Sequence, residues 1–85
     1  MSYQVIAYDV GTTGIKTSLF QISAEEGVRF LSSEVADYSL RMLGGGAIEQ
    51  DPEEWWTAMG RTTRRLLERT GVPKEEIRGI SFCSQ

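Results

Sequence analysis

The chain has 85 residues, with nine Lys or Arg against twelve Asp or Glu, and its formal net charge is -3. This acidic balance argues against nucleic acid as a partner, because neutralising phosphates takes a basic surface. The chain contains no His and a single Cys. Imidazole catalysis, His-ligated metal, an internal disulfide and a CxxC site are therefore excluded.

The length allows one small domain. No apolar run approaches the ~20 residues of a membrane span. The first ten residues lack the basic segment of a signal peptide. We therefore expect a cytoplasmic protein with no membrane partner.

The first half of the chain predicts three strands joined by two short turns. Residues 3–10 form an apolar run typical of a central strand. Residues 15–22 and 28–40 read as two further strands, the last more polar and nearer an edge. Glycines at both ends of 11–14, and the sequence of 24–27, indicate turns. Such connections predict an antiparallel meander.

The second half predicts a loop, a helix and a final strand. Residues 41–50 read as a loop, whose three consecutive glycines favour a flexible connector over a phosphate-binding loop. A helix is predicted over 52–70, because Asp51 can serve as its N-cap, Pro52 as its first residue, and apolar residues follow at helical spacing. Gly71 and Pro73 end it. A strand over 77–85, reached through a helix, is expected to run parallel to the first.

These elements predict an α/β fold of order β-β-β-α-β, a mixed sheet with one face covered by one helix. The other face is expected to carry part of Ile6, Tyr8, Ile80 and Phe82 and to lack a local cover. Gln85 stands at a strand end, where α/β proteins place ligand groups. We therefore expect the chain to be the first part of a longer protein.

The most informative stretch for chemistry runs from residue 9 to residue 16. Asp9 ends the first strand and is a candidate ligand for Mg²⁺, which prefers few carboxylates and keeps several waters. Gly11 lets the backbone approach a bulky anion, Thr12 and Thr13 add hydroxyl donors, and Lys16 adds a positive charge. These groups suit a nucleoside triphosphate. An ordinary hairpin with a polar turn is an equal alternative on composition alone.

The sequence AYDVGTTGIKTSLF resembles the first phosphate-binding segment of the FGGY carbohydrate kinases. That family shares a ribonuclease-H-like core with actin and the heat-shock chaperones. Three further features resemble the sugar-kinase branch: Lys16, the sequence IEQDPEEWW over 48–56, and the sequence IRGIS over 77–81 with Gln85. Xylulose kinases look nearest, and glycerol kinases look further away.

The resemblance implies an ATP- and Mg²⁺-dependent phosphorylation of a sugar or polyol hydroxyl, with a xylulose-like substrate favoured. Asp9 would help place Mg²⁺, residues 11–13 and Lys16 would lie near the β- and γ-phosphates, and Gln85 would begin the sugar-contacting segment. In the family, the catalytic Asp and the adenosine site lie further along the chain. We therefore expect no catalytic residue within residues 1–85, and no kinase turnover from this chain alone.

Two alternatives stay open. A chaperone-like or actin-like ATPase switch would hydrolyse ATP without needing a sugar. A non-catalytic chain would instead self-associate through its bare sheet face, and we expect a homo-oligomer, a dimer. The aromatic pair Trp55 and Trp56 is expected to pack in the core, and so is Cys83, which has no His partner.

Overall fold

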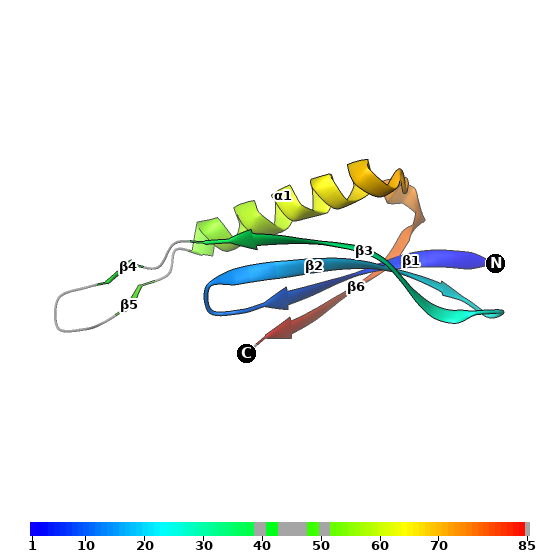
Figure 1. The fold of residues 1–85 in the computed structure, drawn as a ribbon, viewed down its shortest axis with the longest axis horizontal. Coiled ribbons are helices and arrows are strands. Elements are labelled where there is room, and N and C mark those ends of the chain that lie inside the picture. Colours follow the sequence, from blue (N-terminus) through cyan, green and yellow to red (C-terminus); the bar gives the residue numbers. More distant parts are fainter. Residues whose placement is uncertain (39–40, 43–47, 50–51, 85) are drawn as a thin grey trace.

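The computed structural model describes residues 1–38, 41–42, 48–49 and 52–84. A four-stranded sheet has the order β3-β2-β1-β6 and carries one long helix on one face (Figure 1). Its strands are β1 (Ser2–Val10), β2 (Gly14–Ser23), β3 (Gly27–Asp37) and β6 (Ile77–Ser84). The β1–β2 and β2–β3 pairs are antiparallel, and β6 runs parallel to β1. The predicted fold class and strand order are confirmed.

The helix α1 (Pro52–Thr70) has the predicted bounds. The Gly71 N–H donates to the Leu67 carbonyl at 2.9 Å, and Gly71 adopts φ 73°. A left-handed residue after the last turn ends a helix and favours glycine. The 3-10 helix η2 (Lys74–Glu76) then leads into β6.

The end of the third strand and the segment after it differ most from the sequence prediction. The strand β3 ends at Asp37 rather than at residue 40. The predicted loop 41–50 contains a short antiparallel pair, β4 (Arg41–Met42) and β5 (Ile48–Glu49). A two-residue pair is too short to leave a periodic signal in the sequence. The three glycines 44–46, the predicted N-cap Asp51 and Gln85 lie outside the described residues.

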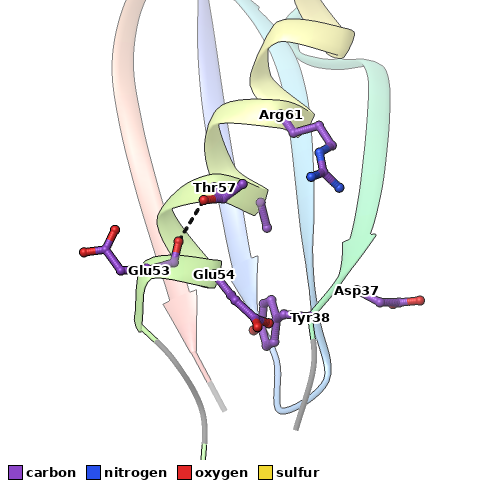
Figure 2. Close-up of a pocket in the computed structure, with 7 residues that line it drawn as sticks. Asp37, Tyr38, Glu53, Glu54, Thr57 and Arg61 are labelled. Atoms are coloured by element: carbon purple, nitrogen blue, oxygen red, sulfur yellow. Dashed lines mark hydrogen bonds between the residues drawn. The ribbon is translucent and has the colours of Figure 1, made fainter.

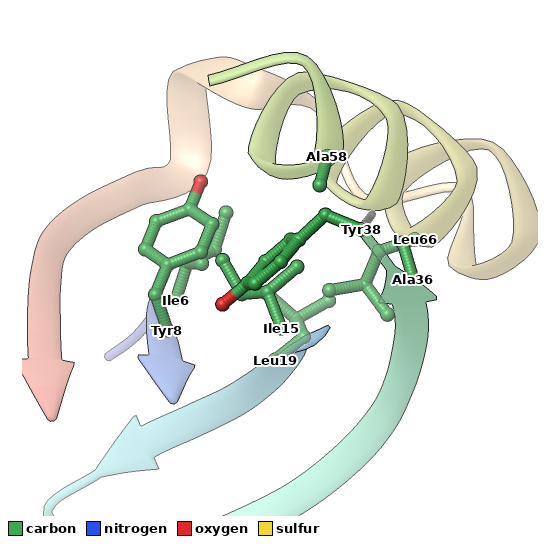
Figure 3. Packing of buried hydrophobic residues seen from close by; sticks show 8 residues of the cluster. All are labelled: Ile6, Tyr8, Ile15, Leu19, Ala36, Tyr38, Ala58 and Leu66. Carbon is green, nitrogen blue, oxygen red and sulfur yellow. The ribbon is translucent and has the colours of Figure 1, made fainter. Parts of the chain in front are cut away.

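The core fills the space between α1 and the sheet (Figure 3). Two hydroxyl pairs cross this interface. Thr17 and Thr62, both fully buried, lie 2.8 Å apart between their Oγ1 atoms, and the Tyr8 phenol lies 2.7 Å from Thr63 Oγ1. Buried polar groups need such partners, so these bonds also fix the helix on the sheet. The buried apolar side chains are Ile6, Tyr8, Ile15, Leu19, Ala36, Tyr38, Ala58 and Leu66.

The assignment of four apolar residues to the uncovered face is wrong. Ile6 and Tyr8 point toward α1 and are only 3% and 6% exposed. Ile80 and Phe82 are their lateral partners in the parallel β1–β6 pair, so they lie on the same face. They are 60% and 63% exposed because α1 packs over β2 and β3 rather than over β6. The helix therefore covers only part of its own face.

Candidate functional site

The turn between β1 and β2 is the centre of the candidate site. The Gly11 N–H donates to the Gly14 carbonyl at 2.9 Å and closes the turn. A Cβ added at Gly14 would lie 2.8 Å from the Ala36 carbonyl oxygen and 2.9 Å from Asp37 Oδ1. Side-chain carbons do not tolerate backbone atoms at that distance, so β3 can approach the turn this closely only if residue 14 is glycine.

Asp9 and Lys16 flank the turn as direct partners in the β1–β2 pair. Each follows or precedes a buried residue that faces the helix, so both side chains lie on the opposite face. Both are exposed. Cys83 is the neighbour of Asp9 on β6 and is also exposed. The expectation that Cys83 lies in the core is wrong, because its place in the strand alternation puts it on the face without a helix.

An open hollow of about 510 Å³ lies around this turn. The predicted residues Asp9, Gly11, Thr12, Thr13 and Lys16 all line it, so the fold brings together every described member of the predicted site. The sequence interpretation missed two of the residues that complete the hollow. These are Val35 and Asp37 of β3, which lie beside Lys16 and Gly14 through the β2–β3 register; the full lining is Asp9, Gly11, Thr12, Thr13, Gly14, Ile15, Lys16, Val35 and Asp37.

Tyr38 braces the turn from the side of the helix and was also missed. Its phenol donates to the Gly11 carbonyl and to the Gly14 carbonyl, the latter at 2.8 Å. Its backbone N–H donates to the Thr13 carbonyl at 3.0 Å. Burial raises the pKa of the Tyr38 phenol, so the hydroxyl keeps its proton and remains a donor. The predicted antiparallel meander could have indicated this contact, because such a meander brings the end of the third strand back beside the first turn.

The residues of the hollow suit a magnesium–phosphate complex. Asp9 and Asp37 supply carboxylates, Thr12 and Thr13 supply exposed hydroxyls, and Lys16 supplies a cation. Among the described residues, no group of three or more His, Cys, Asp or Glu side chains could hold a metal ion. Mg²⁺ does not need such a group, because one or two carboxylates, phosphate oxygens and waters complete its six ligands.

A second, smaller hollow of about 230 Å³ lies where α1 begins (Figure 2). Tyr38 lies beneath the first turns of the helix there, while Asp37 points away from the helix. The Thr57 hydroxyl donates to the Glu53 carbonyl at 2.9 Å. The two hollows share the end of β3, which therefore links the start of α1 to the β1–β2 turn; the lining is Asp37, Tyr38, Glu53, Glu54, Thr57, Ala58 and Arg61.

The aromatic pair at the start of α1 divides between two environments. Trp55 packs against the core, with its ring centroid 6.4 Å from that of Tyr38. Trp56 is 67% exposed. The packing expectation is confirmed for Trp55 and wrong for Trp56, whose position on the helix turns it away from the sheet.

In the part of the chain that the structure describes, no helix is both long and apolar enough to cross a membrane.

The chain is similar in sequence to known kinases. The chain is 32% identical over 85 residues to a glycerol kinase of Alkaliphilus metalliredigens, matching all of this chain and 16% of the relative. It is 30% identical over 81 residues to a xylulose kinase of Staphylococcus epidermidis, matching 95% of this chain and 16% of the relative. The chain therefore spans only about a sixth of the length of the relatives that it matches.

Solved structures show the same fold. The crystal structure of gluconate kinase from Lactobacillus acidophilus matches all of this chain and 16% of that protein, with 27% identity and a TM-score of 0.81. A Ppx/GppA family member of Aquifex aeolicus matches 99% of this chain and 26% of that protein, with 13% identity and a TM-score of 0.63. At that identity the second likeness concerns the fold alone.

The family model of the FGGY family of carbohydrate kinases, N-terminal domain, matches residues 4–85. That range includes the β1–β2 turn, α1 and β6. The four-stranded mixed sheet with its one helix is also the arrangement that the gluconate kinase shares. The chain therefore belongs to the FGGY family of carbohydrate kinases.

Proposed function

We propose that the intact protein transfers the γ-phosphoryl group of ATP to a hydroxyl of a sugar or polyol, in the cytoplasm. The observation that carries this proposal is the hollow around the β1–β2 turn, where Asp9 and Lys16 face each other beside the Thr12 and Thr13 hydroxyls. Phosphoryl transfer depends on positioning and on neutralising charge, and these groups supply both. Residues 1–85 would then be the first part of the N-terminal domain of a two-domain kinase.

In this proposal each residue of the turn and its flanks has a separate role in binding the nucleotide. Asp9 helps hold the Mg²⁺ that neutralises the phosphates. Lys16 adds a positive charge beside the β- and γ-phosphates, and residues 11–13 contact their oxygens. Gln85, outside the described residues, begins the segment that contacts the sugar. The base that takes the proton of the sugar hydroxyl lies beyond residue 85, so the 85-residue chain alone should show no turnover.

A xylulose-like ketose is the favoured acceptor. The relatives named above act on glycerol and xylulose, and the similar structure is a gluconate kinase. The likeness of the chain to a xylulose kinase supports the ketose. A panel with xylulose, gluconate and glycerol on the intact gene product, read as sugar-dependent ADP release, tests this choice. ATP hydrolysis without any dependence on an acceptor would instead support the chaperone-like or actin-like switch.

The role of Asp9 predicts the largest kinetic effect. Replacing Asp9 by Ala in the intact protein should lower kcat/KM by about 10²–10³, the scale on which one electrostatic group in an active site acts. Folding should be unchanged, because Asp9 is exposed and faces away from the core.

Asp37→Ala is the matched control for this variant. Asp37 is also an exposed carboxylate that lines the same hollow, but it lies on β3. Replacing Asp37 by Ala should lower kcat/KM less than replacing Asp9 by Ala does. Equal losses in the two variants, or wild-type kinetics in Asp9→Ala, would contradict the assigned role.

A further inference from the structure

Tyr38 is placed to control the orientation of the phosphate-binding turn, and this inference rests on the proposed function. We infer that the Tyr38 phenol is a positioning residue that turns the peptide between Gly11 and Thr12, so that the Thr12 N–H faces the phosphates. Tyr38 lies 24 residues after Gly14 in the chain and is therefore not part of the sequence motif over residues 9–16.

The contacts of Tyr38 converge on the turn from one side. The phenol donates to the carbonyls of Gly11 and Gly14, and the backbone N–H donates to that of Thr13. Three of the four carbonyls in the turn 11–14 are thus held by one residue. Tyr38 is 8% exposed and its ring lies beside Trp55, so its own position is fixed by the core.

The phenol and the hollow lie on opposite sides of the turn. Tyr38 belongs to the core cluster beneath α1 (Figure 3), whereas Asp9 and Lys16 lie on the face without a helix. Within one trans peptide unit, the C=O and the N–H point in opposite directions. A Gly11 carbonyl held toward the phenol therefore directs the Thr12 N–H toward the face on which the hollow opens. Backbone N–H groups aimed this way are the usual donors to phosphate oxygens.

A phenol suits this task better than a charged or flexible group. The ring is rigid and packed, so holding the hydroxyl in place costs little conformational entropy. The hydroxyl has one proton for two carbonyls, so it holds both in a shared hydrogen bond. The turn is in this way organised before any nucleotide arrives, which lowers the ordering cost of binding.

The test is Tyr38→Phe in the intact protein, which removes the hydroxyl and keeps the ring. Tyr8→Phe is the matched control, since the Tyr8 phenol forms a hydrogen bond of similar length, 2.7 Å, with Thr63 Oγ1 on α1 rather than with the turn. Losing an oriented neutral hydrogen bond should raise the KM for MgATP about fivefold. The KM for the sugar should stay within about twofold, since in the proposed function the turn contacts the phosphates of the nucleotide rather than the acceptor.

A second measurement does not depend on turnover. Amide hydrogen exchange should speed up at residues 11–14 in Tyr38→Phe and not in Tyr8→Phe, because the phenol no longer holds the turn. An active wild-type enzyme in which Tyr38→Phe leaves both the KM for MgATP and the exchange unchanged would overturn the inference. So would equal changes in both variants, which would indicate a merely structural phenol. An inactive wild-type protein would instead overturn the proposed function, while the exchange result would still decide the role of Tyr38.

Discussion

The two faces of the sheet carry different parts of the sequence. The face toward α1 holds the apolar core and two hydroxyl pairs, and these contacts fix the helix over β2 and β3. The other face holds Asp9, Lys16, Asp37 and Cys83, all exposed. The strands alternate between these faces residue by residue. A substitution at a core position should therefore alter stability, and one at a neighbouring position that lines the hollow should alter nucleotide binding.

The largest loss of stability is expected on the helix side, at Leu66. Its side chain is 0% exposed and belongs to the core between α1 and the sheet. Leu66→Ala removes buried apolar surface and leaves a cavity, at a cost of about 2–5 kcal/mol. Thermal unfolding of the intact protein measures the loss. Leu67→Ala is the control, since Leu67 is only half-buried. A smaller loss at Leu66 than at Leu67 would show that α1 packs on another face.

The buried hydroxyl pair should have an intermediate effect. The Thr62 hydroxyl has the Ala58 carbonyl to donate to, at 2.8 Å, so Thr17 is the donor within the pair. Thr62→Val keeps the shape but leaves the Thr17 hydroxyl unpaired, which costs about 1–3 kcal/mol. The double variant Thr17→Val with Thr62→Val should recover part of this loss, because both polar groups are then gone. Strict additivity of the two single losses would contradict the pairing.

The smallest effect is expected at the exposed end of the helix. Arg69 forms an ion pair with Glu34 and donates to Ser32 Oγ at 3.1 Å and to the Ser33 carbonyl at 3.3 Å. Because the Arg69 side chain is 52% exposed, Arg69→Ala should cost at most about 1 kcal/mol. The loss should shrink further in high salt. A loss as large as that of Leu66→Ala would mean that this contact, rather than the core, fixes α1 on β3.

The sequence predicted the elements well because each carries a strong local signal. Apolar runs, glycine turns and helix-ending residues such as Gly71 act within a few positions. The predicted order and the parallel last strand followed from connection rules. The exposure of Ile80 and Phe82 could not be predicted, because it depends on where α1 lies across the sheet.

The candidate site was predicted where its residues are consecutive and missed where they are not. Asp9, Lys16 and the turn between them form one continuous stretch of sequence. Asp37 and Tyr38 reach the same place only through the β2–β3 register, which pairs Asp37 with Gly14. A small shift of that register would move both away from the turn. Their part in the site therefore depends on the fold and not on a motif.

In the proposed function, the exposed carboxylate of Asp9 holds the metal that accompanies the nucleotide. The most direct test is calorimetric titration of ATP into the intact protein, with and without Mg²⁺, for the wild type and for Asp9→Ala. We predict that Mg²⁺ strengthens ATP binding to the wild type and that Asp9→Ala loses most of this strengthening while still binding ATP. An undiminished effect of Mg²⁺ in Asp9→Ala would contradict the account.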